Sequence, residues 1–319
     1  MANLKISFFI ALLVAGIASK SLAQQPTVFL ADPTIFKDKG QYYLYGTGSN
    51  QGFPVYTSAD LKTWKSVTGV ADDLALKRGE AFGNGGFWAP QIIVYKGIYY
   101  MAYTADEHIA IAKASGPGGP FKQDSLVALS GTGKQIDPFL FFDDDGKIYL
   151  YHVKLQNGNR IFVTEMKPDL SDVVAGTAKE CISGTDTWEN TAGSDWPVTE
   201  GPTVLKHKKT YYLIYSANDF RNKDYAVGYA TSTSPYGPWK KYEGNPIISR
   251  HNIGHSGSGH GDVFTDNRHN MYYVLHTHHS EEKVSPRATG LLKLSFKDVK
   301  GGPAVLVADT TTFRWLQKK

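Results

Sequence analysis

The segment Asp137-Pro138-Phe139-Leu140-Phe141, followed after a polar turn by Ile148-Tyr149-Leu150-Tyr151, decides the fold of this chain because four other segments repeat its pattern. Each copy joins a short apolar run to a second run through a polar turn, and the second runs are rich in Tyr. Short runs of Ile, Val, Phe and Tyr fit buried β-strands, and Gly or Asp in the turns suits hairpins. The other copies begin at residues 32, 89, 201 and 261.

The spacing of these repeats indicates the architecture. They start roughly every 50 to 60 residues, and most are followed by a third apolar run and a short candidate fourth strand, such as Gly119-Pro120-Phe121. Five phased repeats of one supersecondary unit favour radial closure. The sequence therefore predicts an all-β, five-bladed β-propeller. A sandwich of repeated hairpins is the alternative.

The N-terminus has the features of an export signal. Lys5 precedes an apolar run from residue 6 to 18 and a small-residue site, Ser21-Leu22-Ala23. The sequence predicts a signal peptide over residues 1–23 and a single propeller domain over residues 24–319, located in the periplasm or outside the cell. The apolar run is short for a membrane span, so none is expected in the mature chain.

Composition narrows the class of protein. Hydrophobic residues make up 41% of the chain, which is enough for a large core, and the lone Cys181 allows no internal disulfide. The net charge is only +4, and no run of five Lys or Arg residues occurs. Nucleic acid is therefore not an expected partner.

The repeat register predicts which side chains meet at the propeller axis. The first strand of each blade lines the axis, and all five run in the same direction. Their starting residues should therefore surround one mouth of the central channel. These residues are Asp32, Trp88, Asp137, Glu200 and His260.

Three carboxylates in one small pocket suit glycoside cleavage. Crowding and burial push the pKa values of such acids apart, so one stays protonated while another ionises. Cleavage needs an acid for the leaving oxygen and a base for water. Trp88 offers a flat apolar face for a sugar ring.

At this point the sequence resembles glycoside hydrolase family 43 over nearly the whole mature chain. The resemblance rests on five motifs in order: Leu30-Ala31-Asp32-Pro33, Phe87-Trp88-Ala89-Pro90, Gln135-Ile136-Asp137-Pro138, Thr199-Glu200-Gly201-Pro202 and Gly259-His260-Gly261-Asp262. A related, retaining invertase-like family has Arg and Cys where this chain has Ile136 and Gly201, so that alternative is disfavoured.

The resemblance implies roles for the motif residues. Asp32 would be the general base, Glu200 the general acid, and Asp137 a third carboxylate that orients Glu200 and raises its pKa. Arg287 matches the arginine that binds the terminal sugar. No cofactor is implied for the chemistry, although family members often hold a structural calcium ion or ordered waters near the position of His260. Inversion requires room for water, so Asp32 and Glu200 should lie roughly 6.5–9.5 Å apart.

The expected substrate is an oligosaccharide or polysaccharide. Ile136 and Trp196, the latter within an insertion from Cys181 to Pro197, are expected to line the sugar pocket with Trp88. The resemblance favours exo-acting removal of terminal sugars from plant-type side chains, with α-L-arabinofuranosidase ahead of β-xylosidase and exo-galactanase. Two alternatives of another kind are a glycan-binding propeller without activity and a zinc hydrolase built from the C-terminal histidines. The latter lacks a zinc-binding motif.

Overall fold

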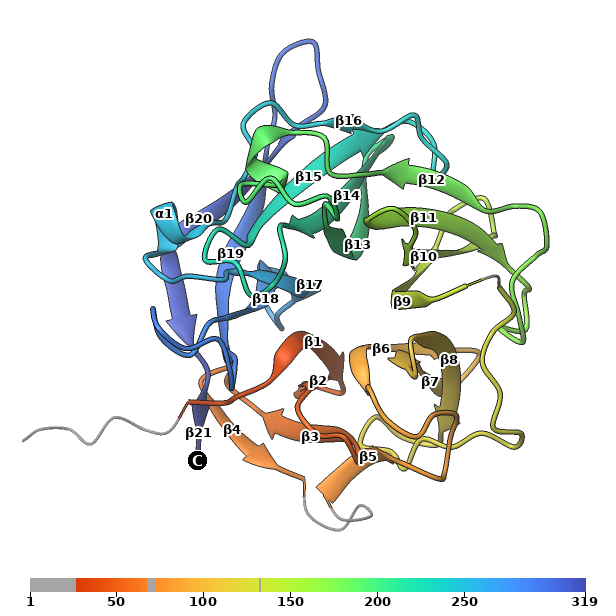
Figure 1. Cartoon of the computed structure of the whole chain (residues 1–319). Helices are drawn as coiled ribbons and strands as arrows, with labels where there is room; N and C mark the ends of the chain where they lie inside the picture. Colours follow the sequence, from red (N-terminus) through yellow and green to blue (C-terminus); the bar gives the residue numbers. More distant parts are fainter. Residues whose placement is uncertain (1–26, 68–72, 132) are drawn as a thin grey trace, which may run out of the picture.

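Five antiparallel sheets surround a central axis in the computed structural model of this protein, so the predicted five-bladed β-propeller is confirmed (Figure 1). The structure describes residues 27–67, 73–131 and 133–319. The predicted signal peptide over residues 1–23 lies outside the described residues. No helix within these ranges has the length and apolar character needed to cross a membrane.

The first two blades follow the predicted repeats. Blade one contains β1 (Ala31–Asp38), β2 (Gln41–Thr47), β3 (Gly52–Ser58) and β4 (Thr63–Ser66), with β5 (Leu74–Lys77) paired to β3. Blade two contains β6 (Trp88–Tyr95), β7 (Ile98–Ala105) and β8 (His108–Ala114). The fourth strand expected at Gly119-Pro120-Phe121 is absent from the described residues. Instead, Phe121 forms an isolated parallel bridge to Leu76 of β5, and the next residue, Lys122, forms an isolated antiparallel bridge to Lys113 of β8. The Phe121 ring is buried in the core between the two blades.

The remaining blades are four-stranded. Blade three contains β9 (Gln135–Phe142), β10 (Ile148–Leu155), β11 (Asn159–Met166) and β12 (Lys179–Ile182). Blade four contains β13 (Thr199–His207), β14 (Thr210–Ala217), β15 (Ala226–Ser232) and β16 (Lys240–Lys241). Blade five contains β17 (Gly259–Thr265), β18 (Met271–Thr277), β19 (Ala288–Lys297) and β20 (Val305–Trp315), with α1 (Arg250–Ile253) beside β20.

The C-terminal strand closes the ring. After β20 of blade five, β21 (Gln317–Lys318) pairs in parallel with β4 of blade one, and the backbone N–H of Val28 donates to the carbonyl of Leu316 at 2.9 Å. The N-terminal and C-terminal segments of the propeller therefore meet at one interface, the one between blades one and five. This closure removes the free edge that β4 would otherwise expose.

The hydrophobic core consists of five clusters, one between each pair of neighbouring blades. Large aromatic side chains fill them: Tyr103 and Phe53 are fully buried between blades one and two, and Tyr151 and Tyr215 between blades three and four. Because every blade is buried on both faces, the strands read as continuous apolar runs in the sequence. This packing fixes each innermost strand against its neighbours around the axis.

Candidate active site

Each innermost strand bends at its predicted motif. The ladder between the first and second strands shifts register there in all five blades. One residue per blade adopts a positive φ between +37° and +59°: Asp32, Ala89, Asp137, Gly201 and His260. A non-glycine residue rarely takes this conformation, and such strain gathers at functional sites.

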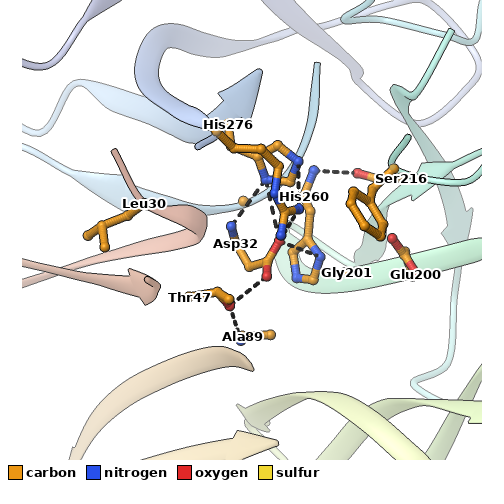
Figure 2. Close-up of polar contacts among 12 residues, drawn as sticks. Leu30, Asp32, Thr47, Ala89, Glu200, Gly201, Ser216, His260 and His276 are labelled. Carbon is orange, nitrogen blue, oxygen red and sulfur yellow. Dashed lines mark hydrogen bonds and ion pairs between the residues drawn. The ribbon is translucent and has the colours of Figure 1, made fainter. Parts of the chain in front are cut away.

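These five bends are tied together by a ring of hydrogen bonds, part of which is shown in Figure 2. At each bend the backbone N–H donates to a side chain of the preceding blade. The five bonds run from Asp32 to His276 Nδ1 (3.1 Å), from Ala89 to Thr47 Oγ1 (3.1 Å), from Asp137 to Thr104 Oγ1 (2.9 Å), from Gly201 to Asp137 Oδ2 (3.1 Å) and from His260 to Ser216 Oγ (2.7 Å). The motifs are therefore held in register with one another across blade boundaries.

Asp32 is a buried carboxylate surrounded by donors. Its Oδ2 accepts from the Thr47 hydroxyl at 2.6 Å, and its Oδ1 lies 3.1 Å from the Arg287 guanidinium. Burial by itself raises the pKa of Asp32, but the interactions with Arg287, His260 and His276 and the Thr47 hydrogen bond together outweigh it and hold the pKa below its usual range. Asp32 is therefore ionised at neutral pH.

The pKa of Glu200 is shifted in the opposite direction to that of Asp32. It is buried, its Oε1 accepts from Tyr225 Oη at 2.8 Å, and its Oε2 accepts from Asn159 Nδ2 at 2.9 Å. Burial and the negative charge of Asp32 raise the pKa of Glu200 to about 7, against the effect of the two hydrogen bonds. A substantial fraction of Glu200 is therefore protonated at neutral pH.

The carboxyl group of Asp137 contacts both the strand that carries Glu200 and the ring of His260. Its Oδ2 accepts from the N–H of Gly201, the residue after Glu200, and is 3.8 Å from His260 Nδ1. Burial and the charges of Glu200 and Asp32 raise the pKa of Asp137 well above its usual value. The His260 ring, whose pKa is lowered by burial, also lies 3.5 Å from Asp32 and packs against Gly201, where a Cβ would meet it at 2.7 Å.

All the side chains predicted for the site line one cavity of about 400 Å³ at the mouth of the axis. This volume is within the usual range for small-molecule pockets. The predicted residues found there are Asp32, Trp88, Ile136, Asp137, Trp196, Glu200, His260 and Arg287. Trp188, the other tryptophan of the insertion, packs instead against Tyr215 of blade four.

The sequence analysis missed five residues of this cavity: Asn159, Val198, Asp219, Phe220 and Arg221. Asn159 connects the two sides of the pocket, because it donates to Glu200 and accepts from Trp196 Nε1 at 2.9 Å. Phe220 lies in the loop between β14 and β15, and the Arg287 guanidinium stacks on its ring at 4.6 Å. None of these residues belongs to a repeated motif. Asn159 is the first residue of β11 and Val198 directly precedes β13, whereas Asp219, Phe220 and Arg221 lie between β14 and β15.

The predicted calcium ion would have to bind among the residues at the propeller axis, near His260. Within the described ranges, no group of three or more His, Cys, Asp or Glu side chains is arranged to hold one. The axial cavity beside His260 has a volume of about 30 Å³, room for one or two waters. The oxygen donors that line this cavity include the carboxyl groups of Asp32, Asp137 and Asp262 and the amide of Gln91, and the predicted calcium site stays a prediction.

Clustered carboxylates with opposed pKa shifts, an aromatic wall and a pocket at the propeller axis define a glycoside hydrolase. Residues 24–299 match the profile of glycosyl hydrolases family 43. The chain belongs to this family, as its five motifs predicted.

Solved structures and curated relatives agree with this family. The chain is 36% identical to an endo-1,4-beta-xylanase from Bacteroides thetaiotaomicron VPI-5482, with a TM-score of 0.84 over 92% of this chain and 98% of the other. It is 35% identical to a thermostable family-43 glycoside hydrolase, with a TM-score of 0.78 over 90% and 95% of the two chains. It is also 26% identical to the extracellular endo-alpha-(1->5)-L-arabinanase 2 of Bacillus subtilis (strain 168), over 96% of this chain and 70% of that protein.

One further relative is bifunctional by name. The chain is 27% identical to a xylosidase/arabinosidase of Butyrivibrio fibrisolvens, over 77% of this chain and 49% of the relative. The chain thus spans about half the length of that protein.

Proposed function

We propose that this glycoside hydrolase acts with inversion and that Asp32, Glu200 and Asp137 carry the chemistry. The observation that supports this most is the contrast between two buried carboxylates in one pocket: Asp32 is kept ionised, and the pKa of Glu200 is raised to about 7. An ionised group accepts the proton of water, and a protonated group donates to the leaving oxygen. The contrast therefore supports Asp32 as the base and Glu200 as the acid.

Asp137 acts as a positioning residue in this mechanism. Its bond to the N–H of Gly201 fixes the strand that carries Glu200, and its own pKa is raised well above the usual value by burial and by the charges of Glu200 and Asp32. Asp32 is oriented by Thr47 and Arg287, so one carboxylate oxygen is engaged by each. Inversion further requires a separation of roughly 6.5–9.5 Å between the acid and base carboxyl groups, and this separation stays a prediction.

The substrate we propose is a terminal α-L-arabinofuranose on a plant-type polysaccharide side chain. The catalytic pocket is walled by Trp88, Trp196 and Phe220, which suits a single sugar ring at its base. β-Xylose is a second candidate, supported by the names of the xylanase and the xylosidase/arabinosidase among similar proteins. A terminal galactose, the exo-galactanase alternative, is a third candidate, supported by the name of a beta-D-galactofuranosidase that is 25% identical over 83% of this chain. Aryl arabinofuranoside, xyloside and galactoside assayed side by side would rank the three.

The test of the mechanism is a pair of isosteric variants. Asp32→Asn and Glu200→Gln should each lower kcat by about 10²- to 10⁴-fold while the thermal unfolding transition stays cooperative. Proton NMR of the wild-type reaction should show the inverted anomer first. Asp219→Asn is the matched control, since Asp219 lines the same cavity but pairs with the neighbouring Arg221. Near-normal rates in either catalytic variant, or a retained anomer, would refute the assignment. Oligosaccharide binding without any turnover by the wild-type chain would instead identify a glycan-binding propeller.

We also propose export and a structural calcium ion as expectations that solution experiments can test. A polymeric substrate must be met outside the cytoplasm, and some relatives are named extracellular. Edman sequencing of the exported protein should begin at Gln24. Calcium bound near His260 should make the unfolding temperature fall on chelation and recover on calcium addition, and an unchanged temperature would argue against it.

A further inference from the structure

A second cavity adjoins the catalytic pocket. It has a volume of about 310 Å³ and is lined by residues of blades one, two and five. Trp88 and Arg287 line both cavities, so these two side chains stand between them. Glu200, Asp32 and Asp137 line the catalytic pocket and are not among the residues that line the second cavity. The second cavity therefore has the position of a binding subsite and lacks the groups for cleavage.

The walls of this cavity have the chemistry of a sugar site. Phe29 and Trp88 are exposed to 40% and 37%, unusually high values for such large apolar side chains. The Phe29 ring is supported by His279, whose ring centroid is 5.4 Å away. Thr47, Ser49 and Asn50 add polar groups, and Asn50 is fixed because its Oδ1 accepts from the N–H of Gly86 at 2.9 Å. Aromatic faces with a few polar groups suit a sugar ring.

The charged side chains that line the second cavity indicate that its ligand is an uncharged sugar ring. Arg287 is the one charged side chain among its described lining residues. That guanidinium is already engaged by Asp32 at 3.1 Å and by the Phe220 ring. A uronic acid would therefore find no free cation there, whereas a neutral pentose or hexose needs none.

The catalytic pocket has a second exposed aromatic side chain that does not line the second cavity. Trp196 is 45% exposed and is linked to Glu200 through Asn159, which accepts from the indole N–H and donates to the carboxylate. Because Trp88 and Arg287 line both cavities, a sugar ring in one cavity has the other cavity as its direct neighbour. A branched polymer can therefore place one ring in each cavity.

We propose that the second cavity binds a neutral sugar ring of a polysaccharide backbone while a branch of the same polymer enters the catalytic pocket. This inference rests on the proposed removal of terminal sugars. It assigns the enzyme to internal branches of a polymer, and Phe29 and Trp88 become the platform that reads the backbone next to the branch point.

The test compares two substrates with one cleaved sugar. One is an arabinoxylan oligosaccharide with a single internal arabinofuranosyl branch, and the other is an aryl arabinofuranoside, which has no backbone. Phe29→Ala should lower the ratio of kcat/KM for the oligosaccharide to kcat/KM for the aryl glycoside by about tenfold, as expected when one stacked ring is lost. Ser285→Trp, which places a large ring at an exposed lining position, should lower the same ratio. Phe142→Ala is the matched control, because Phe142 is 38% exposed at the far end of β9.

The outcomes separate the two proposals. An unchanged ratio in both Phe29→Ala and Ser285→Trp would overturn the subsite while the wild-type enzyme remains an active arabinofuranosidase. Release of a disaccharide or longer product would also overturn it, since the second cavity would then hold a sugar retained with the cleaved one. Failure of the proposed function would be seen in the wild-type enzyme itself, as an absence of turnover of the aryl glycosides and the oligosaccharide.

Discussion

The backbone N–H of Gly201 donates to Oδ2 of Asp137 at 3.1 Å, although the two residues are 64 positions apart and lie in different blades. In the other four blade contacts this N–H donates to a Thr, Ser or His side chain on the second strand of the preceding blade. The corresponding residue of blade three is Val153, which is paired with Ile136 and has no acceptor. Asp137 supplies the missing acceptor, and its carboxylate is thereby fixed beside Glu200.

Asp137→Asn keeps the positioning bond, because an amide oxygen can still accept from Gly201. Burial and the charges of Glu200 and Asp32 raise the pKa of Asp137 well above its usual value, so Asp137 is neutral at neutral pH and an amide is a close replacement. Because burial and the charge of Asp32 raise the pKa of Glu200, the basic limb of the pH–rate profile should stay at its wild-type position. We expect kcat to stay within about tenfold of the wild-type value. Asp137→Ala removes the acceptor and should be slower, and equal rates for the two variants would show that the bond has no role.

Arg287 keeps the base ionised, and Arg287→Met tests this. The guanidinium is the largest of the effects that lower the pKa of Asp32, so this pKa rises when it is removed. Because Asp32 must be ionised to act, the acidic limb of the kcat/KM profile should move to higher pH. The maximum of kcat/KM should also fall by about 10²-fold through lost contacts to the sugar.

Arg221→Met is the matched control for this change. Arg221 lines the same cavity and lies over the Phe220 ring at 5.8 Å, but it pairs with Asp219 and makes no contact with Asp32. Its acidic limb should coincide with that of the wild-type enzyme. An acidic limb that moves equally in both variants would mean that general pocket charge, rather than the contact to Asp32, sets the profile.

Tyr225 tunes the acid, and Tyr225→Phe should reveal the sign of its effect. Its hydroxyl donates to Glu200 at 2.8 Å and favours the ionised carboxylate, so removing it should raise the pKa of Glu200 further. Glu200 acts when protonated, and the basic limb of the pH–rate profile should therefore extend to higher pH. We expect kcat below pH 6 to stay within about tenfold of the wild-type value.

Tyr212→Phe provides the comparison for Tyr225→Phe. This change also removes a buried hydroxyl bond, from Tyr212 to the carbonyl of Ala304 at 2.7 Å, but Tyr212 lies in the hydrophobic core between blades four and five and is not a residue of the catalytic pocket. This variant should lose stability without a change in the pH–rate profile. A basic limb that moves to lower pH in Tyr225→Phe would contradict the proposed direction.

The repeats explain how much of the site could be read from the sequence. Asp32, Asp137 and His260 occupy equivalent bends, and Trp88 and Glu200 come directly before such bends, so counting along five similar segments was enough to bring them together. Asn159 and Phe220 could not be found this way, because they lie outside the repeated motifs and reach the pocket through packing between blades. The positive φ of the bends and the ring of hydrogen bonds likewise depend on neighbouring blades, so they cannot be predicted from the sequence of any one segment.

Closure of the propeller should depend on Leu316, the residue between β20 and β21. Its side chain is fully buried in the cluster between blades one and five, beside Val28 and Trp64, and its carbonyl accepts from Val28. Leu316→Ala leaves a cavity at this seam and should lower the free energy of unfolding by about 2–5 kcal/mol in a urea titration. Val299→Ala removes a similar apolar group from a position that is 42% exposed and should change it by less than about 0.5 kcal/mol. Equal effects would mean that the C-terminal strand contributes little to closing the ring.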